Sequence, residues 1–226
     1  MWTWSSPDAP GCRTRLSSRP PSTIFQSWRK TPMDSLAALR TDFETRSNRS
    51  MSMPIAGMIA WAVIGIAGLL FPLKMAVTIL ILGVSVIFPL ALPIARMRNE
   101  QLTSRANPLA RLMGASVLMV NLLWALHIPL YLKAPSFVPL SVGIGLGLHW
   151  IVYSWIIDHP LGYRHAIGRT VGLVAAWFAF PSNPVTACAA VVVAAYVVTL
   201  VEMARRTPSL SSEVSVATQV PHHRIQ

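Results

Sequence analysis

Charged residues are scarce in this sequence, and acidic residues are the scarcest. Asp, Glu, Lys and Arg together make up 12% of the 226 residues, with 8 acidic against 19 basic side chains. Hydrophobic residues make up 53%, which is above the share found in an ordinary soluble domain. This composition predicts one membrane domain with polar tails.

Cysteine is nearly absent as well. Cys12 lies in the polar N-terminal segment, and Cys188 lies inside the last apolar run. A disulfide framework needs more cysteines, and a CxxC metal site needs cysteines that are close together in sequence. Both are therefore excluded.

Motifs of intramembrane hydrolysis and phosphate chemistry are missing. The sequence has no HExxH helix, no GxSxG elbow, no glycine-rich phosphate loop and no acidic residue deep inside an apolar run. The connection with Asp158, His159 and His165 could hold a metal ion or, with Arg164, form a catalytic site at the membrane edge. A solvated turn explains it more simply, so we expect no enzyme activity, no metal and no cofactor.

Both ends of the chain are polar. Residues 1–32 lack the apolar segment of a secretory signal, and their prolines, serines and arginines with a single acid predict a disordered N-terminal extension. Residues 204–226 are likewise expected to form a disordered cytoplasmic tail.

Met33 is the expected translation start. Asp34 is a suitable N-cap for a helix whose apolar residues recur at helical spacing. Residues 33–53 are therefore predicted to form a short amphipathic cytoplasmic helix and a linker.

The predicted membrane domain covers residues 54–203. It contains six apolar runs that each approach the roughly 20 residues needed to cross the hydrocarbon of a bilayer. These runs are 54–71, 73–95, 109–132, 136–157, 163–180 and 184–203. Short proline-marked connections join them into three helical hairpins. The predicted fold class is all-α, a multi-pass bundle of six transmembrane helices.

Basic residues alternate between the connections. Of the 19 Lys and Arg, 17 lie on one side of the six runs, and Lys74 and Lys133 lie on the other. Because basic residues are retained in the cytoplasm, both termini are predicted to be cytoplasmic. The basic residues neither line one helical face nor form an RNA-binding motif, so the expected partner is the lipid bilayer and not nucleic acid.

Proline occurs inside two of the runs. Pro89 and Pro93 in the second run and Pro129 in the third lack a backbone N–H, so they are expected to kink their helices. Neighbouring helices can compensate the carbonyl groups that are freed.

The fourth run is the one around which the others are expected to pack. As a helix it places Gly143, Gly147 and Trp150 on one side, and His149 and Tyr153 on nearly the opposite side. Small residues admit another helix, and an ionisable ring in hydrocarbon needs a polar partner. Protein is therefore expected to cover both sides. Gly168 and Gly172 in the fifth run repeat the spacing of the first two glycines, which favours a crossing of these two helices.

A polar cluster is predicted inside the bundle. Asn121 in the third run and His149 in the fourth lie at similar depths, roughly 12 to 15 Å from the cytoplasmic edge. With Tyr153 and Arg169 they are candidates for a solute or proton path, because an imidazole can exchange a proton near neutral pH. The alternative is that Asn121 and His149 only satisfy each other's hydrogen bonds. His127 is placed near the outer end of its helix, where a hydrogen bond to lipid headgroups is expected.

Three short phrases resemble a known family. They are Phe88-Pro89-Leu90, Asn107-Pro108-Leu109 and Gly147-Leu148-His149-Trp150. Over about residues 35–205 the chain resembles an uncharacterised family of bacterial six-helix integral membrane proteins, a domain of unknown function. The resemblance implies a location in the bacterial cytoplasmic (inner) membrane and supplies no activity.

Two functions are carried forward as expectations. The first is a permease or proton-linked carrier of a small solute, with Asn121, His149 and Tyr153 lining the path. The second is a membrane-embedded interaction or assembly subunit without transport, a homo-oligomer or the companion of a membrane partner whose helices bind the glycine faces.

Overall fold

The chain is helical throughout the part that the structure describes. A computed structural model describes residues 32–101 and 107–206, with side chains from Leu36 onward. The helices are α1 (Pro32–Ser47), α2 (Ser52–Leu70), α3 (Leu73–Ser85), α4 (Ile87–Arg98), α5 (Pro108–Leu122), α6 (Trp124–Lys133), α7 (Val138–Ile156), α8 (Leu161–Ala179) and α9 (Pro184–Arg205), with 3-10 turns η1 (Asn48–Ser50) and η2 (Pro135–Phe137). No strand occurs in these ranges, so the predicted all-α class is confirmed. The predictions for residues 1–31 and 207–226 lie outside the described residues.

The short helix before the membrane domain starts earlier than expected. α1 begins at Pro32, so Asp34 lies inside the helix and not at its cap. Phe43 on this helix is buried in the hydrophobic core, whereas Leu39 is only partly buried. Glu44 and Ser47 are buried on the same helix, so the packed face of α1 is mixed and not the apolar face that the spacing predicts.

Five helical stretches are long and apolar enough to cross a membrane. They are Leu36–Leu70, Leu73–Arg98, Pro108–Lys133, Pro135–Ile156 and Pro184–Arg205. Within the first stretch, α2 is the apolar part, because the charges lie on α1. The predicted fifth run corresponds to α8, which carries Arg164 and Arg169 and is not among these five. α8 nevertheless has 19 residues, as α7 does, and packs along both α7 and α9.

Two of the crossings are broken near their prolines. The second is divided at Val86, three residues before Pro89, and the third at Leu123, six residues before Pro129. At both breaks the amide N–H bonds a carbonyl three residues back, the tighter pattern of a 3-10 turn. Proline removes one helical hydrogen bond and crowds the preceding turn, which fits the break before Pro89. Pro93 and Pro129 lie inside the unbroken helices α4 and α6, so the predicted kinks are confirmed only at Pro89.

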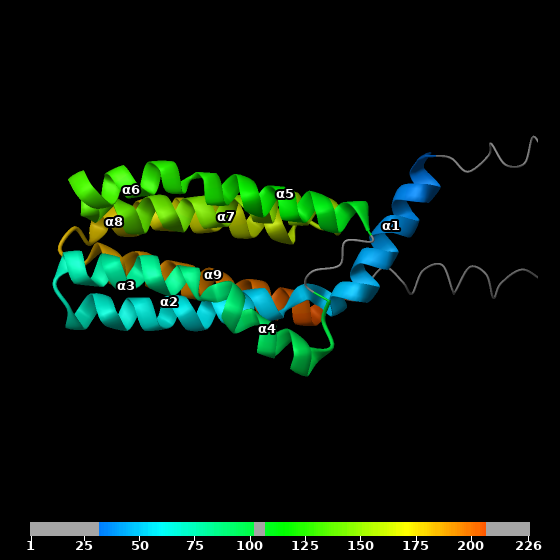
Figure 1. Ribbon diagram of the computed structural model, residues 1–226, viewed down its shortest axis with the longest axis horizontal. Coiled ribbons are helices and arrows are strands. Elements are labelled where there is room, and N and C mark those ends of the chain that lie inside the picture. Colours follow the sequence, from blue (N-terminus) through cyan, green and yellow to red (C-terminus); the bar gives the residue numbers. More distant parts are fainter. Residues whose placement is uncertain (1–31, 102–106, 207–226) are drawn as a thin grey trace, which may run out of the picture. The chain divides into compact units, whose positions relative to one another are not determined.

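The crossings pack in the order that three hairpins require. α2 packs on α3, α5 and α6 pack on α7, and α8 packs on α9. The first and last crossings, α2 and α9, also pack closely on each other. Figure 1 shows α2, α3 and α9 as one layer of the bundle and α5 to α8 as the other.

Large apolar side chains are exposed on the outside of the bundle. Examples are Leu70 on α2 (69%), Leu122 on α5 (67%), Phe178 on α8 (72%) and Val198 on α9 (65%). Soluble proteins rarely expose so much apolar surface on every side, whereas lipid covers it at no cost. The chain is a membrane-embedded protein.

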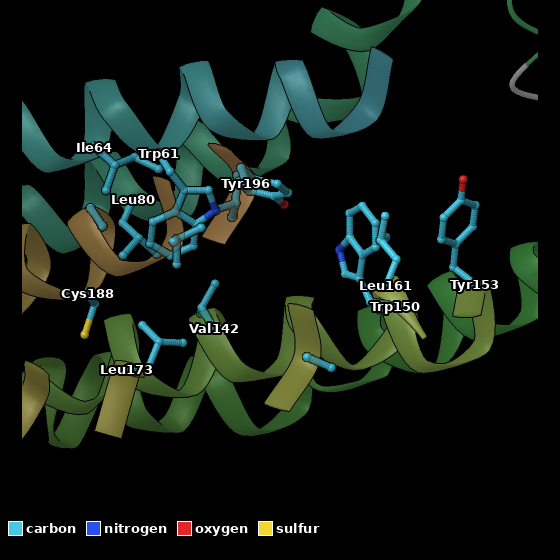
Figure 2. Close-up of a cluster of buried hydrophobic side chains, with 14 of the residues drawn as sticks. Trp61, Ile64, Leu80, Val142, Trp150, Tyr153, Leu161, Leu173, Cys188 and Tyr196 are labelled. Atoms are coloured by element: carbon cyan, nitrogen blue, oxygen red, sulfur yellow. The ribbon is translucent and has the colours of Figure 1, made fainter. Parts of the chain in front are cut away.

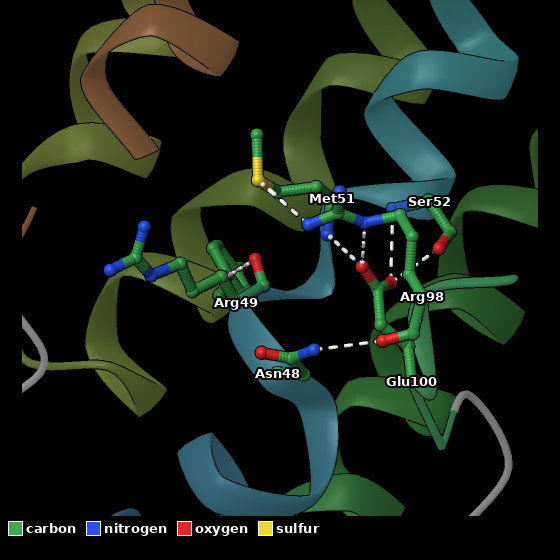
Figure 3. A network of polar contacts seen from close by, with 7 residues as sticks. Asn48, Arg49, Met51, Ser52, Arg98 and Glu100 are labelled. Atoms are coloured by element: carbon green, nitrogen blue, oxygen red, sulfur yellow. Dashed lines mark hydrogen bonds and ion pairs between the residues drawn. The ribbon is translucent and has the colours of Figure 1, made fainter. Parts of the chain in front are cut away.

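The polar end of the bundle is held together by Glu100. Its carboxylate accepts hydrogen bonds from the backbone N–H groups of Met51 and Ser52 at the start of α2, and it pairs with Arg98 at 2.6 Å (Figure 3). The first N–H groups of a helix have no partner inside it, so Glu100 supplies from another segment the cap that α2 lacks. We call this side of the bundle, which holds α1, the end of α4, the start of α5, the α7–α8 connection and the end of α9, the basic end.

The close contact between α7 and α8 differs from the predicted one. A Cβ on Gly143 would meet Leu173, and one on Gly147 would lie 3.4 Å from Cδ of Arg169. Gly168 has nothing within 4 Å, and Gly172 faces Val191 of α9. The predicted packing of these two helices is confirmed, and Gly143 and Gly147 take part in it. The expected part of Gly168 and Gly172 is wrong, because large α8 side chains fill the space above the α7 glycines.

The tightest approach of these two helices occurs at Gly162. A Cβ there would lie 2.0 Å from the carbonyl oxygen of Trp150 and 2.9 Å from Cβ of Ser154. Only glycine fits so close to another backbone. Ser154 strengthens the contact, since its hydroxyl oxygen accepts a hydrogen bond from the N–H of Tyr163 and bonds the carbonyl of His159.

Candidate functional site

A pocket opens at the basic end of the bundle. It has a volume of about 790 Å³ and is lined from α1, η1, α2, α4, α5 and α7. Arg46, Gln101 and Arg111 line it and are exposed, while most of the remaining lining is apolar. This size and this mixture of apolar walls with a few polar groups are typical of small-molecule sites.

The pocket reaches His149 well inside the bundle. His149, Trp150 and Tyr153 all line it, and His149 lies seven residues before the end of α7 at Ile156. At the rise of an α-helix this corresponds to about 10 Å below the end of α7. The hydroxyl of Tyr153 lies 3.5 Å from the carbonyl oxygen of Arg49 in η1, so it joins the pocket wall to the turn at the pocket mouth.

Both predicted faces of α7 are covered by protein. Gly143, Gly147 and Trp150 are buried on one side, and Tyr153 is buried on the other, with His149 partly buried. The prediction that α7 is packed from two sides is confirmed.

Asn121 does not take the place that the sequence predicts. It is exposed on α5, and its amide nitrogen donates to the carbonyl of Val117 in the same helix at 2.9 Å. The described residues show no hydrogen bond between Asn121 and His149. Val117 lines the pocket, so Asn121 lies one turn beyond it on the same face of α5.

His127 also lies elsewhere than predicted. It is 4% exposed and lies 3.1 Å from the hydroxyl of Ser141 on α7, with its ring edge-on to Trp124. Its role is therefore in helix packing, and the expected contact with lipid headgroups is wrong.

Arg169 is buried at the centre of the bundle. It is 1% exposed, and its guanidinium lies 5.6 Å from the ring of Trp61 and 5.5 Å from the ring of Tyr196. Its Nη1 lies 3.5 Å from Nε2 of His165. None of the five ion pairs in the described ranges includes Arg169, so no carboxylate of those residues balances its charge.

His165 fixes the position of Arg169. Its Nδ1 lies 2.7 Å from the hydroxyl of Thr199, which donates to the carbonyl of Ala195. Because the Thr199 proton is used in this way, Nδ1 carries the imidazole proton and Nε2 is the acceptor that faces Arg169. His165 also stacks on Trp150, with ring centroids 4.3 Å apart. The loop position expected for His165 is thus wrong, and the residue belongs to the interior of α8.

The turn between α7 and α8 holds the other predicted polar residues. Asp158 is exposed and pairs with Arg40 of α1 at 2.7 Å. Nδ1 of His159 lies 3.3 Å from the N–H of Leu161, the first residue of α8. Burial and the nearby charge of Arg164 lower the pKa of His159 below its usual 6.5. Within the described ranges no three His, Cys, Asp or Glu side chains come together as metal ligands.

Four buried nitrogen atoms in the bundle interior have no hydrogen-bond partner among the described residues. They are Nε and Nη2 of Arg169 and the indole Nε1 atoms of Trp61 and Trp150. Figure 2 shows the nitrogen-bearing edges of the two indoles turned toward each other. All four atoms are donors only.

Sequence reasoning found Arg169 but not the residues around it. Trp61, Thr199 and Tyr196 are ordinary members of apolar runs and carry no motif. The sequence feature that could have predicted part of this cluster is the four-residue spacing of His165 and Arg169, because residues four apart on a helix lie on the same face. That spacing places the imidazole beside the guanidinium.

Comparison with known proteins gives a family and no activity. Searches of curated proteins and of solved structures find no match. The model of a family of unknown function, DUF7010, matches residues 36–206. The chain belongs to this family.

Proposed function

We propose that the chain is a permease or proton-linked carrier of a small solute, with the pocket at the basic end as its entry site. The observation that carries the proposal is the extension of this pocket to His149, about 10 Å inside the bundle.

The lining supports solute binding followed by movement along the bundle axis. Exposed arginines, Arg46 and Arg111, lie at the mouth, and His149 and Tyr153 line the inner part. Ionisable groups inside membrane bundles typically mark solute or proton paths. No covalent step is proposed, in keeping with the expectation that the chain is not an enzyme.

Orientation follows from the distribution of charge. The basic end carries the arginines of α1, α4 and the start of α5, whereas Lys74 and Lys133 lie at the other end. The positive-inside rule places the basic end in the cytoplasm. We place the chain in the bacterial cytoplasmic membrane, so the pocket opens toward the cytoplasm.

Gly114 offers a sharp test of the proposal. It lines the pocket, and a Cβ on it would have nothing within 4 Å, so Gly114→Trp can project a large ring into the pocket without a clash at Cβ. Gly168→Trp is the matched control, because Gly168 has equally open surroundings on α8 and does not line the pocket.

The measurement is solute-driven flux in proteoliposomes that contain a pH-sensitive dye. A panel of small carboxylates, amines and sugars is applied to vesicles with the wild-type chain and each variant. Flux that is lost in Gly114→Trp and His149→Ala and kept in Gly168→Trp supports the proposal. Absence of any flux from the panel, or equal flux in all variants, would refute it.

The assembly function keeps one observation in its favour. Asn121 presents a polar amide on the exposed surface of α5, and a partner helix could satisfy the remaining hydrogen-bonding groups of that amide. Crosslinking through Asn121→Cys in a background without Cys12 and Cys188 distinguishes the two functions. A stable partner together with absent flux supports assembly, and a chain that stays alone contradicts it.

A further inference from the structure

We infer that Arg169 is the centre of an oxyanion-binding site, in which the indole N–H groups of Trp61 and Trp150 also donate to a carboxylate or phosphate group. This inference rests on the proposed function for the route by which the anion enters. It names the chemical class of the solute and adds a site that lies beyond the pocket itself.

Charge is the first argument. Arg169 is 1% exposed and belongs to none of the ion pairs in the described ranges. Arginine keeps its proton in proteins, so the bundle interior holds a fixed positive charge. The two ring contacts, with Trp61 and Tyr196, stabilise this charge in part. Burial of an uncompensated charge is more costly than such contacts are stabilising, so the rings offset only part of this cost.

Hydrogen bonding is the second, independent argument. Apart from Nε of Arg40 on α1, the unpartnered buried side-chain atoms of the described residues are two nitrogens of Arg169 and the Nε1 atoms of Trp61 and Trp150, all of them donors. Buried donors without a partner are rare in folded proteins. A group that satisfies several of these buried donors and no acceptor must itself be an acceptor, and one that also balances a guanidinium must carry negative charge. A carboxylate or a phosphate meets both requirements, since arginine binds both through paired N–H groups.

The neighbouring residues present Arg169 to such a group. The hydrogen-bonded series Ala195, Thr199 and His165 holds one guanidinium nitrogen. Gly147 allows the Arg169 side chain to pass close to α7, because a Cβ there would lie 3.4 Å from Cδ of Arg169. The remaining nitrogens of the guanidinium are left for a ligand.

Trp150 connects this site to the pocket. It lines the pocket, and its ring stacks on His165, which contacts Arg169. An anion that passes the exposed arginines at the mouth therefore needs a displacement of the Trp150 ring to reach Arg169.

The test measures anion binding directly, without transport. The full chain is purified in a neutral detergent, and its thermal unfolding is followed in chloride-free buffer of constant ionic strength with increasing sodium acetate or sodium phosphate. We expect a saturable rise in Tm for the wild-type chain, because a ligand that binds only the folded state stabilises it. Arg169→Gln should abolish this rise. Arg164→Gln, which changes an exposed arginine of the same helix, should leave it intact.

A second variant covers the case in which Arg169→Gln does not fold. Trp61→Phe keeps an aromatic ring beside the guanidinium and removes one N–H donor, so the anion affinity should fall by about fivefold to tenfold, the loss of about one hydrogen bond. No saturable effect of either anion on the wild-type chain would overturn the inference. So would a wild-type response in both Arg169→Gln and Trp61→Phe.

Two further comparisons are needed. The first distinguishes a lipid phosphate from a free anion as the ligand, and the second distinguishes failure of the carrier proposal from failure of the anion site. Titration with phosphatidylglycerol against phosphatidylcholine in the same detergent shows whether a lipid phosphate or a free anion occupies the site. Anion binding without flux in proteoliposomes would refute the carrier proposal and leave the site in place. Flux that is unaffected by Arg169→Gln, with no anion binding, would refute the site and leave the carrier proposal in place.

Discussion

Single residues decide how closely α7 and α8 approach each other. A Cβ on Gly162 would lie 2.0 Å from a backbone oxygen of α7, whereas one on Gly168 would have nothing within 4 Å. The four-residue spacing of two glycines in α7 and of two in α8 predicted that the helices cross. The closest contact is made by another glycine, Gly162, which is not part of that spacing. Spacing shows which residues share a face, but it does not show which neighbouring side chain fills the space above them.

Gly162→Ala should destabilise the chain strongly. The nearest atom belongs to the backbone of α7 and cannot rotate away, so α7 and α8 must separate, with an overpacking cost of about 1 to 3 kcal/mol. Gly168→Ala is the matched control and should be neutral or slightly stabilising, because alanine favours the helix over glycine. Thermal unfolding of both variants in detergent checks this, and equal Tm values for the two would contradict the assigned contact.

His159 should make the turn between α7 and α8 sensitive to acid. Its pKa is lowered by burial and by Arg164, and its Nδ1 accepts the N–H of Leu161. Because the folded chain disfavours the proton, the unfolded chain binds more protons below about pH 6.5, the usual value. Stability from this residue is complete above that pH and falls as the pH is lowered toward the reduced pKa.

The acid effect is measured as the difference in Tm between pH 7.5 and pH 5.5, taken as roughly one unit on either side of the ordinary histidine pKa. His159→Asn keeps an acceptor near Leu161 and cannot be protonated in this range, so it should lose less stability on acidification than the wild-type chain. An identical loss in both chains would assign the acid sensitivity to other groups.

At the scale of helices, the position of α1 depends on Asn107. Asn107 is 2% exposed, and its amide nitrogen donates to the carbonyl of Leu39 and to the carboxylate of Asp42, both at 2.8 Å. Its Oδ1 accepts the N–H of Leu109 and so caps α5. One side chain therefore fixes α1, part of the pocket lining, onto the start of α5. These hydrogen bonds explain why an asparagine stands at the start of Asn107-Pro108-Leu109.

Asn107→Ala should loosen α1 and weaken the start of α5. The loss of a cap and of two buried hydrogen bonds is expected to cost about 1 to 3 kcal/mol, and the amides of α1 should exchange faster with deuterated solvent. Asn107→Asp retains the cap but places a carboxylate against Asp42, so it should loosen α1 and leave α5 protected. If α1 exchanges at the wild-type rate in both variants, Asn107 does not hold it.

The helices themselves were largely predictable, and their contacts were not. The apolar runs predicted five of the crossings within a few residues, and Pro89 predicted the break at Val86, whereas the break at Leu123 has no proline within one turn. Asn121 was misplaced because depth along a helix was used without its rotation, and rotation decides whether a side chain faces a neighbour or lipid. His165 was assigned to the connection because it was grouped with Asp158 and His159, although it lies inside the predicted run 163–180 and inside α8.

At the scale of the whole molecule, α8 is the crossing that composition alone does not establish. It carries Arg164 and Arg169 and is not among the five apolar stretches. Its 19 residues and its packing between α7 and α9 nevertheless fit a helix that crosses beside them. If α8 crosses, its two ends face opposite sides of the membrane, and the polar residues inside it are shielded by protein as membrane helices require.

Labelling of the two ends decides the question. In a background without Cys12 and Cys188, Tyr163→Cys at the start of α8 should react with an impermeant maleimide only after the cells are opened. Ser182→Cys in the α8–α9 connection should react in intact cells, because that connection lies at the end away from the arginines. Both substituted residues are exposed, so accessibility within the fold does not bias the result. Labelling of both positions from the same side would mean that α8 does not cross. A Tyr163→Cys variant that reacts in intact cells would place the basic end outside and reverse the orientation assigned to the pocket.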